Sequence, residues 1–483
     1  MEKNILIKKT KVVATLGPVS ETVEVLEQMI RAGLNVARFN FSHGAYEWHE
    51  KVMQNVRTAA KNVGVPIAIL ADLQGPRVRT HVSAEVVITS GETIKLFDVS
   101  QTDEVIAKSA ANAKYIALDC PHIVDAITVG NDILIEDGLM KLRAVDKTAE
   151  YVVCDVVDGG TVKNHKGVNI PDASIPLPTM TKKDYDDLAF ALAHDVDYVA
   201  LSFVRNGQDI VDVRQNMQKI IGEETYLPKI ISKIECKEAL GNMDRILAAT
   251  DAVMIARGDL GIEMDPTTIA ILEKDILEKS IHHLRPVIVA TQMLASMEHN
   301  ARPTRAEVAD VTNAVADHTD AVMLSGESSM GAYPVEAVDT MAQIAAHTEV
   351  SPYDDMLVAM PITFSSEEVR IAHATYDFAK EMHAQAIVIY SESGYTARML
   401  SHYRPEQQII VVTNRQKAYN QLALVWGVNS FLAAGEESRE QCINHAIDAA
   451  KGKGILHTGD LVITILGTTK LGKKLTLTGT RLI

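Results

Sequence analysis

Cysteine is scarce in this sequence, which limits the covalent and metal-bound structures that the chain can form. The four cysteines are far apart, and none belongs to a C-x-x-C pair. This spacing argues against a disulfide framework and a structural zinc site, and it predicts a reducing, cytoplasmic location. The positions are Cys120, Cys154, Cys236 and Cys442.

Long apolar runs and an excess of positive charge are also missing. No run approaches the length of a membrane span, and the first residues lead into a strand-like segment rather than a signal peptide, so we expect no membrane partner. The net charge is −16, with 47 Lys and Arg against 63 Asp and Glu, which gives no electrostatic support for nucleic-acid binding. If so acidic a chain handles phosphorylated anions, it must gather its cations locally.

The sequence does contain a recurring pattern of short apolar, β-rich segments separated by helical patterns. With 483 residues, 47% of them hydrophobic, the chain is long enough for several domains. Strands that alternate with helices pair in parallel, and eight such units are typical of a (β/α)8 barrel. The eight predicted strands begin near Lys11, Val36, Ile67, Tyr198, Lys229, Ala252, Val287 and Ala321.

The interval between the third and fourth predicted strands is much longer than the others. Residues 76–176 within it are short β-type runs between turn residues, with little helical periodicity. We therefore predict a barrel built from residues 1–75 and 177–348, with a small all-β domain of residues 76–176 inserted into it. From about residue 349 the pattern changes again, and residues 349–483 are predicted to form a separate open α/β domain.

Two charged side chains end the fifth predicted strand. Lys233 and Glu235 are two residues apart, so on a strand both point to the same face. Buried charges are costly unless they are paired or bind a ligand, which leaves a structural ion pair and a functional site as the two interpretations. The next strand runs into Gly258 and Asp259. Two carboxylates with a lysine between them favour a divalent-metal site that faces an anionic substrate.

Polar side chains also end other predicted barrel strands. Arg38, Asn40 and Ser42 occupy every second position of the second strand, so they share one face, and His43 follows. Active sites of such barrels lie at the C-terminal strand ends, so these groups are predicted to share one rim. The other strand ends add Asp72, Leu73, Arg77, Arg79, Thr291 and Ser325.

Two further motifs have a structural as well as a functional interpretation. Thr304 and Glu307 form a T-x-x-E pattern, for which a helix capping box is preferred over a direct catalytic role. In the third domain, the turn Ser393–Thr396 follows a predicted strand and precedes a predicted helix. Its backbone N–H groups could hold a phosphate, although turns of this kind are common before helices.

Taken together, these motifs resemble the pyruvate kinase family. The resemblance implies a catalytic barrel, a mobile inserted lid and a regulatory α/β domain, assembled as a homotetramer. It also implies transfer of a phosphoryl group from phosphoenolpyruvate to ADP, which gives pyruvate and ATP in the final step of glycolysis and uses Mg²⁺ or Mn²⁺. The matching segments are NVARFNFSHG at 35–44, IISKIE at 230–235, ARGDLGIE at 256–263, ATQMLASM at 290–297, RPTRAE at 302–307 and LSGES at 324–328.

The same resemblance implies roles for individual residues. Glu235 and Asp259 would hold Mg²⁺, while Lys233 and Arg38 would neutralise charge on the migrating phosphoryl group. Thr291 would help to protonate the enolate.

Other implied contacts involve sets of residues. The substrate carboxylate would meet the backbone of Ala256, Arg257, Gly258 and Asp259. The nucleotide would contact Asn40, His43, Arg79 and Lys166, the last only after lid closure. A sugar-phosphate or nucleotide effector would bind near Ser391, Ser393, Gly394 and Thr396.

One position departs from the family pattern. Many members bind K⁺ through the positions that are here Asn40, Ser42, Asp72 and Leu73, with a nearby Glu that completes the local charge. This chain has Arg77 at the position of that Glu. The exchange adds about two units of positive charge beside the site. We therefore expect Arg77 to replace the monovalent cation, so that K⁺ is not required.

Two alternatives remain open on the sequence. A Mg²⁺-dependent barrel that forms a pyruvate enolate but makes or cleaves a C–C bond would share the metal carboxylates, yet it has no use for a lid carrying Lys166. A catalytically inactive, ligand-binding paralogue would be expected to lack some of the four central residues. All four are present, namely Lys233, Glu235, Asp259 and Thr291.

Overall fold

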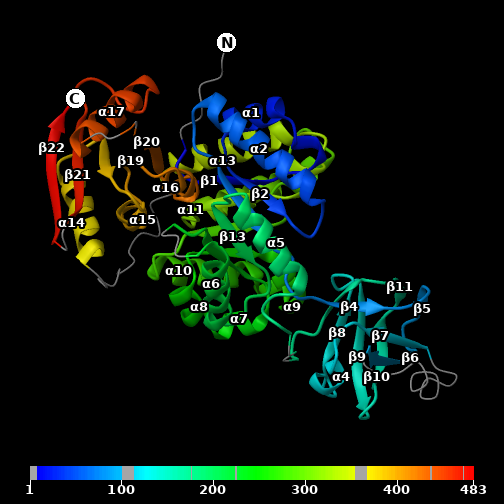
Figure 1. Cartoon of the computed structure of the whole chain (residues 1–483). Helices are drawn as coiled ribbons and strands as arrows, with labels where there is room; N and C mark the ends of the chain where they lie inside the picture. The colour runs from blue at the N-terminus through cyan, green and yellow to red at the C-terminus, as the bar shows by residue number, and fades with distance from the viewer. Residues whose placement is uncertain are drawn as a thin grey trace.

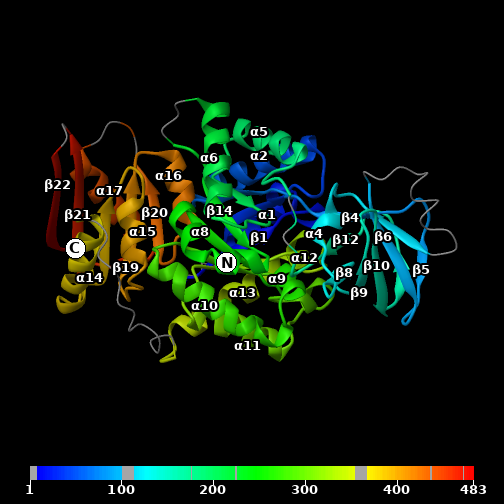
Figure 2. The ribbon, with the colours of Figure 1, turned by 90° about the horizontal axis from the view of Figure 1, so that it is seen from below.

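The structure, a computed structural model, arranges the chain as three units in a row with a barrel in the middle (Figure 1, Figure 2). Parts of all three predicted domain ranges lie outside the described residues. No helix in the described part of the chain is both long and apolar enough to cross a bilayer. The structure describes residues 8–99, 114–173, 175, 177–222, 226–353, 367–433, 435, 438–470 and 473–483.

Eight parallel strands close the predicted barrel. Going round it, the strand order is β1, β17, β16, β15, β14, β13, β3 and β2, so all eight predicted strands are confirmed. Side chains alternate along each strand: Val12 packs under the surrounding helices, and Val13 packs inside the barrel. The strands are β1 (Lys11–Thr15), β2 (Leu34–Asn40), β3 (Ala68–Asp72), β13 (Tyr198–Leu201), β14 (Lys229–Ile234), β15 (Ala252–Ala256), β16 (Val287–Ala290) and β17 (Ala321–Leu324).

Helices surround the barrel and bury its outer face. Their starts follow the local sequence: Thr304 caps one helix and forms the predicted capping box with Glu307, so that prediction is confirmed. The helices are α1 (Val23–Ala32), α2 (Tyr46–Val63), α5 (Lys182–Ala193), α6 (Gly207–Ile221), α7 (Lys237–Gly241), α8 (Met243–Ala249), α9 (Arg257–Glu263), α10 (Ile269–His282), α11 (Arg305–Ala316), α12 (Gly326–Ser329) and α13 (Pro334–Glu349).

The inserted domain leaves the barrel after β3 and returns before α5. It is a second closed barrel, of seven strands, with a separate two-stranded sheet of β5 and β11 and a hydrophobic core of its own. Figure 2 shows it at the end of the molecule opposite the third domain. Its elements are β4 (Val78–His81), β5 (Val86–Ile88), β6 (Thr93–Asp98), β7 (Tyr115–Leu118), α4 (Ile123–Ala126), β8 (Asp132–Ile135), β9 (Met140–Lys147), β10 (Val152–Asp158), β11 (Gly160–Val162) and β12 (Gly167–Asn169).

The third domain is an open five-stranded sheet in the order β20, β19, β18, β21 and β22. Its first four strands are parallel, and β22 pairs antiparallel with β21. The fold class predicted from the sequence is therefore confirmed. The elements are α14 (Glu367–Glu381), β18 (Ala386–Tyr390), α15 (Tyr395–Ser401), β19 (Gln408–Thr413), α16 (Gln416–Gln421), η5 (Leu422–Leu424), β20 (Val428–Leu432), α17 (Arg439–Gly452), β21 (Leu461–Lys470) and β22 (Lys473–Leu482).

The third domain closes the N-terminal end of the barrel. Ala423 and Leu424 of η5 belong to the same buried cluster as the inward-facing barrel side chains. Arg404 of the third domain forms a fully buried ion pair with Asp320, at 3.1 and 3.0 Å, and also donates to the His318 carbonyl at 2.7 Å. The far end of the barrel, at the carboxyl ends of its strands, is left open for a site.

We expect Arg404→Ala to destabilise the protein by about 3–5 kcal/mol, because it leaves the buried Asp320 carboxylate without its cation. Urea unfolding followed by circular dichroism measures this loss. The matched control is Lys51→Ala, which removes an exposed pair with Glu21 at 3.3 Å and should cost at most about 1 kcal/mol. Equal losses for the two variants would contradict the structural role of the buried pair.

Candidate active site

Five strand ends converge on a cavity of about 530 Å³ at the C-terminal end of the barrel. The strands are β2, β3, β13, β14 and β15, with residues from the inserted domain on the far side. Most of the predicted site residues line this cavity, so the structure brings them together. The lining residues are Arg38, Asn40, Ser42, His43, Asp72, Leu73, Gln74, Arg77, Arg79, His165, Ser202, Phe203, Lys233, Glu235 and Asp259.

Lys233 is the best-anchored cation in the cavity. Its Nζ lies 2.9 Å from Glu235 Oε1 and 3.3 Å from Asp72 Oδ1, and it donates to Ser202 Oγ at 2.7 Å. Successive side chains of a strand point to opposite faces. Ile234 packs in the helix layer, so its two charged neighbours both point to the cavity. Burial alone would lower the pKa of Lys233, but the two carboxylates together raise it above its ordinary value.

Asp72 holds a second cation in the same network. Arg38 Nε and one terminal nitrogen both lie 2.7 Å from Asp72 Oδ2, and the other terminal nitrogen donates to Thr15 Oγ1 at 2.7 Å. Burial would raise the pKa of Asp72, but Lys233 and Arg38 hold it below its usual range. One buried carboxylate therefore fixes two cations that face the cavity.

Glu235 and Asp259 are the two carboxylates that could hold a metal ion. Glu235 accepts from the Phe203 N–H at 2.7 Å, and burial raises its pKa, with Asp259 adding to the rise and Lys233 opposing it. In the described residues no group of three or more His, Cys, Asp or Glu could enclose a metal. A cation here would rely on two carboxylates plus water and substrate oxygens, which fits Mg²⁺.

Thr291 lies just outside the cavity lining, beside the start of α9. Its Oγ1 accepts from the Gly258 N–H at 2.9 Å. Thr291 and Gln292 both have a positive φ, of 70° and 55°, which is unusual for a β-branched residue and its neighbour. The Arg257 guanidinium donates to the Thr291 carbonyl at 2.7 Å and pairs with Asp310, so it holds this strained turn in place.

The inserted domain contributes Arg77, Arg79 and His165 to the cavity wall. Arg77 pairs with Asp137 of the inserted domain at 2.6 Å and lies 3.9 Å from Asp259. Lys166 does not line the cavity and forms an ion pair with Glu136 within the inserted domain. The nucleotide contact of Lys166 stays a prediction that depends on closure of the inserted domain.

Arg77 also packs against the backbone of the inserted domain. A Cβ atom placed on Gly167 would come within 2.5 Å of Arg77 Nε, so only glycine leaves room for the guanidinium in this position. The guanidinium thus sits between β12, Asp137 and the carboxylate of Asp259.

Sequence reasoning missed two residues that shape the site. Ser202 donates to the Leu73 carbonyl at 2.8 Å while it accepts from Lys233, and the Phe203 N–H holds Glu235. Both residues follow β13. The Ser202 hydroxyl at the end of that strand could have been recognised as a candidate site group from the sequence, whereas a backbone N–H such as that of Phe203 cannot be recognised from residue types.

Two family models match the chain. The pyruvate kinase barrel-domain model covers residues 7–338, and the pyruvate kinase alpha/beta-domain model covers residues 369–477. The chain belongs to the pyruvate kinase family. Membership of this family makes it a phosphotransferase, and the family generally needs Mg²⁺.

Individual relatives agree with this assignment. The pyruvate kinase of Geobacillus stearothermophilus is 41% identical over 464 residues, and that of Staphylococcus haemolyticus is 39% identical over 471 residues. Each alignment covers 95% of this chain and 78% of the relative. The crystal structure of a pyruvate kinase from Cryptosporidium parvum matches with a TM-score of 0.88 and 33% identity, covering 98% of this chain and 96% of that one.

In the third domain, the turn that resembles the effector loop of pyruvate kinases opens α15. The Gly394 N–H donates to Ser391 Oγ at 3.0 Å, and the Tyr395 N–H donates to Ser393 Oγ at 3.4 Å. These two amides already have acceptors within the loop. A phosphate bound here would have to replace the serine hydroxyls.

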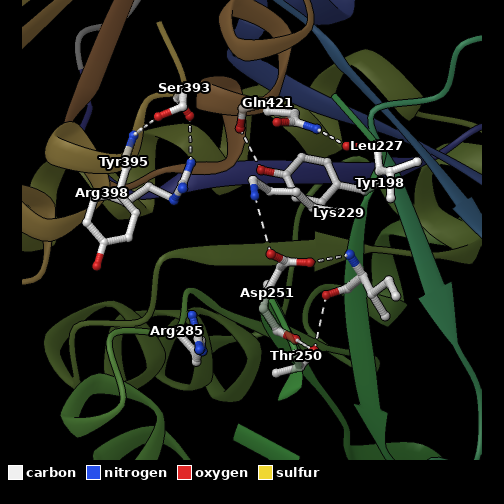
Figure 3. Close-up of polar contacts among 12 residues, drawn as sticks. Tyr198, Leu227, Lys229, Thr250, Asp251, Arg285, Ser393, Tyr395, Arg398 and Gln421 are labelled. Carbon is white, nitrogen blue, oxygen red and sulfur yellow. Dashed lines mark hydrogen bonds and ion pairs between the residues drawn. The ribbon is translucent and has the colours of Figure 1, made fainter. Parts of the chain in front are cut away.

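Arg398, on the helix that follows this turn, lies close to the N-terminal end of the barrel (Figure 3). Figure 3 shows Arg398 of α15, which donates to the Ser393 carbonyl at 3.1 Å, on the same side of the cluster as Lys229. Lys229 pairs with Asp251 at 3.3 Å, and burial and the charge of Arg398 lower the pKa of Lys229 to about 8. Lys229 and Arg398 thus lie near one carboxylate, that of Asp251, at the start of β14, the strand that carries Lys233 near its other end.

We expect Ser202→Ala to lower the kcat for pyruvate kinase activity about tenfold to a hundredfold with little change in stability, because Lys233 loses one of its three anchors. Steady-state kinetics and thermal unfolding measure the two effects. The matched control is Ser328→Ala: this serine is also buried at a barrel strand end, but its hydroxyl donates to the Thr15 carbonyl at 2.9 Å. Equal activity losses in both variants would contradict the positioning role of Ser202.

Proposed function

We propose that the cavity at the C-terminal end of the barrel transfers the phosphoryl group of phosphoenolpyruvate to ADP, giving pyruvate and ATP. The observation that carries this proposal is the position of Lys233, a buried ammonium held between two carboxylates and facing a cavity that Arg38 also lines. Phosphoryl transfer leaves charge on the equatorial oxygens, so fixed cations supply most of the catalysis.

Lys233 acts in this proposal as a fixed charge. Its pKa is raised despite burial, so the side chain stays an ammonium over the working pH range and does not donate its proton. Arg38 joins it as the second phosphate contact. Asp72 pairs with both and keeps them from moving toward the solvent.

Glu235 and Asp259 would hold the Mg²⁺ that the family needs. Bound there, the ion supplies positive charge beside the phosphoryl and enolate oxygens. Two protein carboxylates suit Mg²⁺, which keeps several waters and takes its other ligands from the substrate. Burial, and to a lesser extent the negative charge of Asp259, raises the pKa of Glu235. This supports the proposal because a bound cation would stabilise the ionised carboxylate.

Partners can also be assigned to the carboxylate and to the enolate carbon of the substrate. We assign its carboxylate to the backbone from Ala256 to Asp259, where α9 begins, because helix starts present N–H groups to anions. Thr291 lies against that helix start, 2.9 Å from the Gly258 nitrogen, in position to help protonate the enolate carbon through water. The side chain of Arg257 is engaged with Asp310 and fixes Thr291 rather than the substrate.

ADP is assigned to the side of the cavity nearest the inserted domain. Asn40, His43 and Arg79 all line the cavity, and Arg79 comes from the inserted domain, which supports this assignment. Lys166 would join them only when the inserted domain closes and its pair with Glu136 breaks.

We further propose that Arg77 replaces a monovalent cation. Its guanidinium lines the cavity together with Asn40, Ser42, Asp72 and Leu73, the positions that hold K⁺ in many members of the family. The guanidinium forms ion pairs with Asp137 at 2.6 Å and Asp259 at 3.9 Å, so its positive charge lies between the proposed metal carboxylate and the inserted domain.

The homotetramer, the cytoplasmic location and the sugar-phosphate or nucleotide effector expected from the sequence stay predictions.

We expect Glu235→Gln and Asp259→Asn each to lower kcat about a thousandfold or more, because each removes a metal ligand. A coupled assay of ATP formation from phosphoenolpyruvate and ADP with Mg²⁺ measures this, and Mn²⁺ binding followed by electron paramagnetic resonance gives a readout independent of turnover. Glu263→Gln is the matched control, since this half-buried carboxylate accepts from Asn169 and does not line the cavity. Unchanged Mn²⁺ affinity in the first two variants would contradict the metal assignment, and cleavage of a C–C bond without ATP formation would favour the alternative barrel enzyme.

We expect the wild-type enzyme to work equally well in tetramethylammonium buffer with and without K⁺. Arg77→Glu should create a K⁺ requirement, because it restores an anion beside the site, whereas Arg77→Lys should stay independent because it keeps the charge. The measurement is kcat/KM over a K⁺ series for the three proteins. A stimulation of the wild type by about a hundredfold would rule out the replacement of K⁺ by Arg77.

A further inference from the structure

The end of β2 and the turn after it carry three polar residues to the active-site cavity. Asn40, Ser42 and His43 all line that cavity. Two hydrogen bonds shape the turn from within: the Ser42 N–H donates to Asn40 Oδ1 at 3.1 Å, and the His43 N–H donates to the Asn40 carbonyl at 3.2 Å. The carbonyls of Phe41 and His43, on either side of Ser42, instead accept hydrogen bonds from two side chains outside the turn.

Lys183, in the first turn of α5, holds the Phe41 carbonyl. Its Nζ donates to that oxygen at 2.7 Å and to Asp187 Oδ2 at 2.6 Å. Asp187 is fully buried and also accepts from the Tyr46 hydroxyl at 2.7 Å. Since a buried carboxylate needs a cation beside it, the pair that Lys183 completes also keeps its ammonium in place. The Phe41 carbonyl therefore meets a fixed, charged donor.

His49, on α2, holds the His43 carbonyl. Its Nε2 lies 2.9 Å from that oxygen, and because a carbonyl only accepts, Nε2 carries the hydrogen. Burial lowers the pKa of His49, so at neutral pH the ring is neutral and has this single N–H. The ring also stacks on Phe41, with centroids 4.4 Å apart and 12° between the planes. Both the N–H and the face of the His49 ring are thus engaged with the turn.

Holding these two carbonyls fixes the residues between them. Each peptide group is planar, so the direction of a carbonyl also sets the direction of the N–H that follows it. The Phe41 carbonyl sets the peptide plane before Ser42, and the His43 carbonyl sets the plane after His43. Lys183 and His49 are not among the described residues that line the cavity, so they act on it through this backbone.

The first turn of α5 also holds both connections of the inserted domain. Asp184, next to Lys183, accepts the Gly75 N–H at 2.9 Å and the Thr181 N–H at 2.8 Å. Gly75 lies between β3 and β4, where the chain leaves the barrel, and Thr181 caps α5, where the chain has returned. Adjacent residues of one helix therefore support the turn after β2 and the base of the inserted domain, which are the two sides of the cavity assigned to ADP.

We propose that Lys183 and His49 are positioning residues for the nucleotide, because they hold the turn on which His43 meets ADP. This inference rests on the proposed function, which assigns ADP to this side of the cavity. Without these two donors the turn would have to be ordered by the nucleotide itself, and the ordering would weaken binding. The cations assigned to phosphoenolpyruvate are held separately, by the carboxylate of Asp72. Loss of either donor therefore weakens the binding of ADP and spares that of phosphoenolpyruvate.

Steady-state kinetics of the full-length enzyme with Mg²⁺ tests the proposal, with ADP varied at saturating phosphoenolpyruvate and the reverse. Lys183→Met combined with Asp187→Asn removes the cation together with its buried partner, so that no carboxylate is left unpaired. We expect this double variant to raise the KM for ADP about tenfold and to change the KM for phosphoenolpyruvate by less than about twofold. The matched control is Lys182→Met, which removes the same charge from the neighbouring exposed lysine of α5 and should leave both KM values unchanged.

Two substitutions at His49 separate its hydrogen bond from its packing. His49→Phe keeps a ring against Phe41 but has no donor, whereas His49→Gln keeps an N–H donor but has no ring. We expect the Phe variant to raise the KM for ADP about tenfold and the Gln variant to stay within about threefold of the wild type. The opposite order would show that His49 only packs against the turn, and it would overturn the positioning role of this residue.

Calorimetric titration of each protein with ADP and Mg²⁺ gives the same comparison without turnover, and unfolding midpoints show that the variants are folded. An unchanged KM and Kd for ADP in the double variant and in His49→Phe would overturn the proposal. An equal rise in the KM for phosphoenolpyruvate would also overturn it, because the disturbance would then not be confined to the nucleotide. Failure of the proposed function is distinguishable, since the wild type would then form no ATP while the Kd comparison still decides the positioning role.

Discussion

The structure depends on a buried ammonium that is kept charged at the end of a barrel strand. Removing Lys233 from water is costly, and only the paired carboxylates of Asp72 and Glu235 offset that cost. Asp72 also holds Arg38, and Glu235 also accepts the backbone N–H of Phe203, so that each member of the network is fixed by another. A site built this way presents positive charge without having to rearrange when the substrate arrives, which is what transfer of a phosphoryl group requires.

The two-residue alternation of side chains along a strand predicted part of this network, whereas the rest depends on how the barrel strands pair. Lys233 and Glu235 could be placed side by side because residues two apart on a strand share a face. The partnership of Asp72 with Arg38 could not be predicted, because it depends on the pairing of β2 with β3, which sets Asn40 opposite Asp72. The positive φ of Thr291 and the N–H of Phe203 belong to turns whose conformation leaves no pattern in the side chains.

The order of the domains along the chain was easier to predict from the sequence than the contacts between them. The long interval after the third strand predicted an inserted β domain, because apolar segments with a barrel-like spacing resume after it. The plug formed by Ala423 and Leu424 was not predictable, since a short apolar run in the third domain looks the same whether it packs within that domain or inside the barrel. For Arg77, likewise, the sequence indicated a change of charge, and only the structure shows that Asp137 and Gly167 determine where that charge lies.

Each end of the barrel has a buried lysine on one of its strands, and the surroundings shift the pKa values of the two lysines in opposite directions. At the C-terminal end, β14 carries Lys233 between carboxylates, so the cation is compensated within the protein and stays protonated. At the N-terminal end, β1 begins with Lys11, whose ammonium donates to the Val428 carbonyl of the third domain, and burial lowers its pKa to about 8 although Glu349 and Asp320 oppose the shift. Since β1 also carries Thr15, which accepts a hydrogen bond from Arg38, this strand joins Lys11 at one end of the barrel to a cation that lines the cavity at the other.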